Sequence, residues 1–177
     1  MAPIEDRTRT EPLAHCEAGA RIAALIGASD LPAPEIVLNR PDGVFHADSD
    51  VFVATVRNPA ATPVQVYLDF FDQDGKVYHL LPEPLARDNR VLPGSTVQVG
   101  HGSDLAGEQD RVWRLSEPYG LGLVVATVSE RPLYDGLRAI GEDSAAYLAF
   151  LASAVPKAAR GGRLAMSEVQ IETRSGR

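Results

Sequence analysis

The stretch that most constrains the fold runs from Val64 to Pro82 and reads VQVYLDFFDQDGKVYHLLP. Residues 64–71 alternate between two sets of side chains, which is the pattern of a β-strand with one face in a core. Residues 72–75 (DQDG) interrupt this pattern, and Gly75 can take the positive φ that a tight turn needs. An extended segment follows, and Pro82 ends it. The stretch therefore predicts two strands joined by a tight turn.

Short segments rich in β-branched residues recur along the chain, with a turn signal between neighbours. Residues 121–129 (LGLVVATVS) are apolar on both faces and predict a central strand. No helical pattern separates the strands, which argues against a parallel βαβ sheet. We predict a mainly β protein, an antiparallel β-sandwich of about seven or eight short strands with a flanking helix near each end. The expected strands are 35–39, 51–57, 64–71, 76–81, 95–100, 111–116, 121–129 and 164–174.

Both expected helices follow from apolar residues at helical spacing. The first begins near Glu11, and its apolar stripe includes Cys16, which indicates a buried small side chain rather than a nucleophile. The second begins at Asp143 or Ser144, which are good N-caps, and we expect it to stop at Pro156. Its buried stripe comprises Tyr147, Leu148, Leu151 and Val155.

The length of 177 residues limits the number of domains, and the net charge limits the kinds of partner. Residues 1–10 predict a disordered or linker arm, and residues 11–177 a single β-rich domain. The net charge of -7 disfavours nucleic acid as a partner, because there is no basic surplus to displace counterions. No apolar run approaches the ~20 residues of a membrane helix, and residues 1–16 lack a signal-peptide core. Location stays open between the cytoplasm and, for a piece of a longer protein, the envelope; so does the oligomeric state.

Two segments resemble metal-binding or cofactor-binding motifs, but neither has the residue spacing that its motif requires. Residues 72–75 resemble a calcium loop, but Phe70 and Leu81 occupy ligand positions, so a hairpin turn is favoured. Gly120 and Gly122 lack the third glycine of a dinucleotide fingerprint and indicate close packing of strands. With a single cysteine, no cysteine-rich zinc site forms. We expect no metal and no cofactor. The histidines are scattered, at His15, His46, His79 and His101.

His79 lies inside an expected strand. Its alternation places it with Val77 and Leu81, toward the core. A hydrogen-bonded sheet histidine is the favoured interpretation. The alternative is a small hydrolase centred on His79, which requires Asp69 or Asp72 beside the ring together with a nucleophile.

The single tryptophan, Trp113, belongs to the expected strand 111–116. Together with Tyr119 it has the chemistry to stack on a sugar or a peptide, since both side chains pair an aromatic face with a polar atom. Packing in the core is the favoured interpretation for Trp113.

A turn-rich loop from Glu83 to Gly94 is the candidate contact surface for a protein partner. Its charged residues adjoin Leu85 and Val91, and arginine beside apolar side chains suits a protein interface. An ordinary solvated connector is the slightly favoured interpretation. The residues predicted to bind the partner are Arg87, Asp88, Asn89 and Arg90.

Several segments occur in an order that resembles a known family over about residues 42–155. It is the bacterial domain of unknown function found C-terminal to serine/threonine protein kinases and caspase-like peptidases. The resemblance implies a non-catalytic accessory module with no established catalytic residue and no known ligand. The motifs that carry it are Tyr67-Leu68, Asp74-Gly75, His79-Leu80-Leu81-Pro82, Asn89, Pro93-Gly94, Pro118-Tyr119-Gly120 and Ser129-Glu130-Arg131-Pro132-Leu133.

We therefore expect a non-catalytic binding or sensory module of a bacterial multidomain or envelope-associated protein, docking a protein or a cell-envelope glycan. Kinase signatures are absent from the sequence, and no enzymatic activity is expected. Two alternatives remain open, the small hydrolase centred on His79 and a structural subunit of an envelope assembly.

Overall fold

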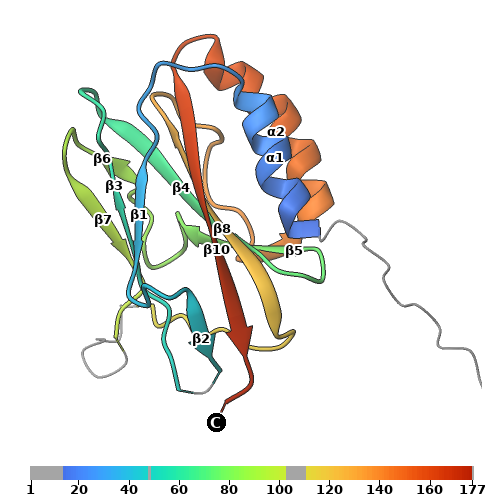
Figure 1. Ribbon diagram of the computed structural model, residues 1–177. Coiled ribbons are helices and arrows are strands. Elements are labelled where there is room, and N and C mark those ends of the chain that lie inside the picture. The colour runs from blue at the N-terminus through green and yellow to red at the C-terminus, as the bar shows by residue number, and fades with distance from the viewer. Residues whose placement is uncertain (1–13, 48, 103–110, 177) are drawn as a thin grey trace, which may run out of the picture.

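The chain forms three layers, a pair of helices, a large sheet and a small sheet (Figure 1). The computed structural model describes residues 14–47, 49–102 and 111–176, and side chains from Glu17 onward. The predicted arm at residues 1–10 lies outside the described residues. The elements are α1 (Ala14–Ile26), β1 (Glu35–Leu38), β2 (Val44–His46), β3 (Ala54–Arg57), β4 (Val64–Phe71), β5 (Lys76–Leu81), β6 (Arg90–Val91), β7 (Thr96–Val99), β8 (Gly120–Ser129), β9 (Gly141–Asp143), α2 (Ser144–Ala159) and β10 (Leu164–Arg174).

The two sheets confirm a mainly β fold that fits a sandwich with flanking helices. The large sheet has the order β2-β10-β8-β4-β5-β9, with β6 also paired to β4, and the small sheet has the order β1-β3-β7. Every pair of neighbouring strands is antiparallel except β2 and β10, which are parallel. β8 lies between β10 and β4, as its two apolar faces predict.

The strand prediction fails where strands are very short. β2, β6 and β9 span only two or three residues, too few for alternation to show, and were not predicted. Conversely, the expected strand 111–116 makes a single antiparallel bridge, from Trp113 to Phe52, and belongs to no named strand.

The predicted hairpin is β4 and β5 with the turn between them. The Asp72 side chain accepts hydrogen bonds from the backbone N–H groups of Asp74 and Lys76, at 2.9 and 2.8 Å. Gly75 has a φ of 81°, which explains a glycine at this position. The expectation that only one face of the first strand is buried is wrong, because the large sheet is covered on both sides.

Two hydrophobic cores flank the large sheet. Between the sheets, Val66, Leu68 and Phe52 belong to one buried cluster. Between the large sheet and the helices, Phe71 and Leu151 belong to the other. Alternate residues of β4 therefore enter different cores, and both faces of this strand exclude water.

The helices follow the predicted stripes but not all the predicted ends. The N-cap prediction is confirmed, because the Ala146 N–H donates to Asp143 Oδ1 at 2.9 Å. The prediction that Pro156 ends the helix is wrong, since α2 continues to Ala159. This extra turn buries Ala158, and the free energy gained by that burial offsets the loss of the backbone hydrogen bond that proline cannot donate. Tyr147, Leu148, Leu151 and Val155 are buried as predicted.

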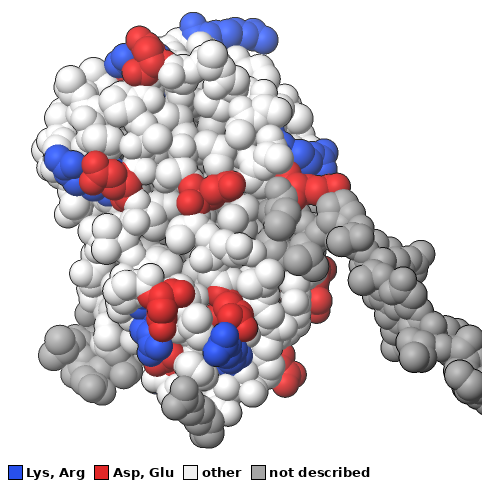
Figure 2. All heavy atoms as spheres, in the orientation of Figure 1, with Lys and Arg blue, Asp and Glu red and all other residues white. Residues whose placement is uncertain are grey.

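The N-terminal helix is seen from Ala14, so its predicted start at Glu11 and the Cys16 side chain lie outside what the structure describes. No helix among the described residues combines the length and the apolarity needed to cross a membrane. Acidic and basic side chains lie beside one another on the face in Figure 2, and its described part carries no large basic patch.

Candidate functional site

His79 is held between two carboxylates under helix α2. Its side chain is 1% exposed, and its ring lies edge-on to that of Tyr147 of α2, with the centroids 4.6 Å apart. Nδ1 lies 2.7 Å from Asp69 Oδ1 on the paired strand β4, and Nε2 lies 2.8 Å from Glu142 Oε1 on β9. The Tyr147 hydroxyl of α2 donates to Asp69 Oδ2 at 2.8 Å. The favoured interpretation of a hydrogen-bonded sheet histidine is therefore confirmed.

Burial and neighbouring charges shift the pKa values of three groups in this cluster. Burial disfavours the imidazolium, but the hydrogen bonds and charges of Asp69 and Glu142 outweigh it and raise the pKa of His79. Hydrogen bonding from the Arg138 guanidinium, and then from His79, lowers the pKa of Glu142. Burial, reinforced by the Asp69 charge, raises the pKa of Tyr147 well above its ordinary value. The cluster therefore ties β4, β5, β9 and α2 together by charge-assisted hydrogen bonds.

The hydrolase alternative requires an aspartate and a nucleophile beside the ring of His79. Asp69 does pair with His79, and both ring nitrogens are hydrogen-bonded to carboxylates; among the described residues, no hydroxyl or thiol is hydrogen-bonded to either nitrogen. Asp72 bonds within the hairpin turn, not to the ring. The sequence predicts that His79 shares one face of its strand with Val77 and Leu81. Val77 does lie in the core on the helix side, but Leu81 packs between the two sheets. The reason is that the register between β4 and β5 shifts next to Leu68 and Asp69.

The predicted partner-binding loop divides into exposed and buried residues. Arg87, Asp88 and Arg90 are exposed. Asn89 is 8% exposed, and its side-chain amide donates to the Val66 carbonyl at 2.9 Å. Its inclusion in the presented surface is wrong, because pairing of β6 with β4 pulls Asn89 against the edge of β4.

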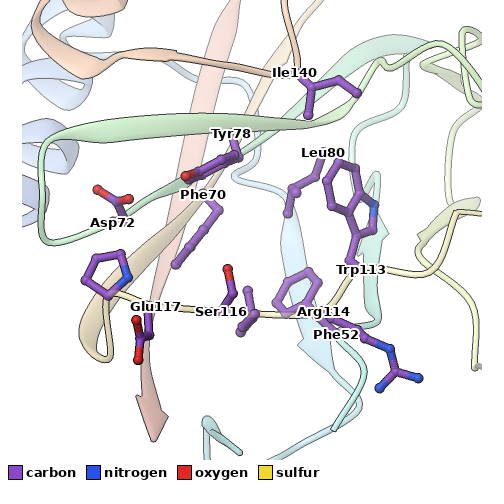
Figure 3. Close-up of a pocket in the computed structure, with 12 residues that line it drawn as sticks. Phe52, Phe70, Asp72, Tyr78, Leu80, Trp113, Arg114, Ser116, Glu117 and Ile140 are labelled. Atoms are coloured by element: carbon purple, nitrogen blue, oxygen red, sulfur yellow. The ribbon is translucent and has the colours of Figure 1, made fainter. Parts of the chain in front are cut away.

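An aromatic cavity of about 230 Å³ lies between the β4–β5 hairpin and residues 113–118 (Figure 3). Trp113 is anchored there by the hydrogen bond from the Phe52 N–H to its carbonyl, at 2.8 Å. Phe70, one of the lining residues, packs closely on Gly122, since a Cβ at this glycine would lie 2.4 Å from Phe70 Cε2. This confirms the close packing expected at this glycine. The apolar and aromatic lining comprises Phe52, Phe70, Tyr78, Leu80, Trp113, Leu115, Pro118 and Ile140.

Two carboxylates line this cavity, the exposed Glu117 and the buried Asp72, and Asp72 has an oxygen without a donor. Asp72 is 5% exposed, and both of its recorded hydrogen bonds end on Oδ1, so that no described residue donates to Oδ2. Figure 3 shows Asp72 on the same side as the Tyr78 hydroxyl, the Ser116 hydroxyl pointing inward, and Arg114 pointing away. The cavity therefore joins an aromatic floor to an acidic wall.

Sequence reasoning did not identify this cavity. The sequence places Trp113 in an expected strand and Asp72 in an expected turn. About forty residues separate these two positions along the chain, so no local pattern links them. Only the presence of a lone tryptophan beside a Pro-Tyr-Gly turn signalled the region. Among the described residues, no three His, Cys, Asp or Glu side chains gather as a metal-ligand set.

Comparison with protein families gives a match to one part of the chain, less than half of its length. Comparison with curated proteins and with solved structures gives no match. The family match covers a narrower range than the expected 42–155, and it includes every residue of the aromatic cavity except Ile140. A domain of unknown function (DUF4384) is found at residues 52–132.

Proposed function

We propose that this protein is a non-catalytic binding module that docks a protein partner through the aromatic cavity. One observation carries the proposal, an apolar cavity of about 230 Å³ with the Asp72 carboxylate in its wall. An engineered cavity of about 150 Å³ binds benzene, so this one has room for an aromatic or large aliphatic side chain. Clefts with a mostly apolar lining and a few placed polar groups are the usual form of binding sites.

The chemistry of the walls selects the segment that fits. Asp72 Oδ2 lacks a donor among the described residues and lies in a side chain that is only 5% exposed. This oxygen is free to accept a charge-assisted hydrogen bond from a cationic group that enters the cavity. The occupant is therefore a peptide segment that places an apolar side chain on the aromatic floor and a lysine or arginine at Asp72. The net charge of -7 favours the approach of such a segment.

The wider role is that of an accessory module in a larger bacterial protein. The family match at residues 52–132 supports it, and so does the resemblance to domains that follow kinases and caspase-like peptidases. The exposed Arg87, Asp88 and Arg90 supply a second contact surface for the same partner, next to Leu85 and Leu92, which are 48% and 52% exposed. The hydrolase alternative has less support, because both nitrogens of His79 are engaged.

Panning a random peptide library on the full chain tests the proposal. We expect enrichment of peptides with an aromatic or large aliphatic residue next to lysine or arginine. Ser116→Trp fills the cavity from its exposed side and should abolish binding of the enriched peptides, whereas Ser116→Ala should retain it.

Asp72→Asn tests the acidic wall. It keeps an oxygen for the turn N–H groups but removes the charge, so the enriched basic peptides should bind about tenfold more weakly. Enrichment of acidic peptides, or equal binding to Ser116→Trp and Ser116→Ala, would refute the proposed site.

A further inference from the structure

Helix α1 begins at the end of the large sheet that carries the β4–β5 turn (Figure 1). A Cβ at Gly19 of this helix would lie 3.1 Å from Leu123 Cδ2. Leu123 is in turn the register partner of Phe71, the residue before Asp72. The segment that precedes α1 therefore joins the fold close to the turn whose Asp72 lines the aromatic cavity.

This segment has the length to reach the cavity. The cavity lies on the side of the large sheet away from α1, because its lining residues Phe70 and Leu80 belong to the core between the sheets. Stacked layers lie roughly 10 Å apart, so a path from the helix layer around the end of the large sheet is roughly 20 Å long. At about 3.3 Å per residue, Arg7 can lie roughly 23 Å from Ala14 and Ile4 roughly 33 Å.

The charged residues of the cavity have a fixed order along it. Figure 3 shows Asp72 and Glu117 toward the β4–β5 turn, and Trp113 and Arg114 toward the other end. Arg114 is exposed and pairs with no carboxylate of a described residue. Asp72 Oδ2 also lacks a partner there, and it is not one of the unpaired polar atoms that solvent cannot reach. From the turn outward, the cavity therefore presents two carboxylates and then a guanidinium beside the aromatic floor.

Residues 4–9 (IEDRTR) carry the complementary series. Counted back from α1, two arginines come first, at positions 9 and 7, then two acidic residues, and then Ile4. Arginine pairs with carboxylates through charge-assisted hydrogen bonds, and an aliphatic side chain suits an apolar floor. The order of opposite charges therefore matches the order along the cavity, and the apolar residue falls at its aromatic end.

We propose that residues 4–9 of this chain occupy the aromatic cavity and compete there with the peptide partner. The two arginines contact Asp72 and Glu117, the acidic pair lies against Arg114, and Ile4 packs on the aromatic floor. The inference rests on the proposed function, because it takes the cavity to be a peptide site. It assigns that site a regulator within the same chain, since a partner binds only by displacing residues 4–9.

The single tryptophan lines the cavity and reports on its occupant. Ile4→Ser combined with Arg7→Gln and Arg9→Gln removes the apolar and basic side chains without shortening the chain. We expect this triple variant to shift the fluorescence of Trp113 to longer wavelength and to increase its quenching by acrylamide, because water replaces residues 4–9. Unchanged signals would overturn the inference.

A matched control changes three other residues of the same segment. Thr8→Ser, Thr10→Ser and Glu11→Gln together should leave both signals as in the wild type, and an equal response would contradict the assignment. The signals of the wild type should also stay constant on dilution. A change on dilution would assign residues 4–9 of a second copy to the cavity and overturn a contact within one chain.

A double-mutant cycle tests the pairing with Asp72. Replacing both arginines by glutamine should change the Trp113 signals less in an Asp72→Asn background than in the wild type, because the carboxylate that they contact is then neutral. Equal changes in the two backgrounds would overturn the assigned contact.

Peptide binding separates this inference from the docking proposal. Peptides enriched on the full chain should bind the triple variant at least about tenfold more tightly, since residues 4–9 no longer occupy the site. If the Trp113 signals change but no peptide binds, occupation by residues 4–9 is supported and docking of a partner is refuted. If peptides bind both proteins equally and the signals do not change, docking stands and this inference is overturned.

Discussion

His79 shows how one buried residue can bind several elements together. Its ring joins Asp69 on β4 to Glu142 on β9, and Asp69 in turn accepts from Tyr147 on α2. Taking these groups out of water costs free energy, and only the completeness of the hydrogen bonds offsets that cost. Removing one member therefore leaves the other charges buried without compensation.

We expect His79→Gln to lose about 3–5 kcal/mol of unfolding free energy near pH 6, because a buried pair is broken. The pKa of His79 is raised on folding, so its contribution is complete below the ordinary value of about 6.5 and is lost as pH rises through the folded pKa. The difference between wild type and variant should therefore shrink from pH 6 to pH 9 in urea unfolding. Tyr147→Phe, which keeps the titrating ring of His79, is the control and should retain the wild-type pH slope. A difference independent of pH would contradict this account.

Helix α2 is held on the sheet by its buried stripe and by its cap. The Asp143 side chain accepts a hydrogen bond from the Ala146 N–H, and the buried stripe of the helix continues past Pro156 to Ala158. The stripe packs on β4 and β8 residues such as Phe71 and Val125, in the core on the helix side. This packing is what brings Tyr147 within reach of Asp69, so the helix serves both the core and the polar cluster.

Leu151 lies near the middle of this stripe and is 2% exposed. Leu151→Ala should cost about 2–5 kcal/mol, since it removes buried apolar surface and leaves a cavity. Ser153→Ala, at an exposed position of the same helix, should change stability by less than about 0.5 kcal/mol. Chemical denaturation of both variants measures the contrast, and similar small effects would mean that α2 does not contribute to the folded core.

The whole molecule depends on burying the large sheet on both sides. The family match at residues 52–132 contains β3 to β8 but neither β10, which pairs along the length of β8, nor α2. Without them, β8 loses a neighbour, and Phe71 and Val125 lose their cover. Exposed apolar faces and unpaired strand edges favour aggregation over folding.

We therefore expect a fragment of residues 52–132 to show no cooperative thermal unfolding, whereas the full chain unfolds in one transition. Circular dichroism during heating, together with the dispersion of amide NMR signals, distinguishes the two. A fragment with a sharp transition and dispersed signals would show that the matched region folds without its flanking elements.

The sequence alone determined those features that repeat over many neighbouring residues. The β4–β5 hairpin, the doubly apolar β8 and the stripe of α2 each show their period within eight or more residues, and a local period depends only on which faces are buried. The turn at Gly75 and the cap at Asp143 are equally local, because each acts on a backbone within a few residues of itself.

Only the tertiary structure decided features made by residues far apart. His79 and Glu142, and Glu83 and Arg111, meet through strand pairing and chain crossing, which no spacing in the sequence records. Asn89 is buried because β6 pairs with β4, and a two-residue strand has no pattern of its own. The aromatic cavity likewise needs distant segments, since Tyr78 of the hairpin and Trp113 line it together. Packing between distant segments determines these sites, since burial and hydrogen-bond partners are properties of the assembled fold.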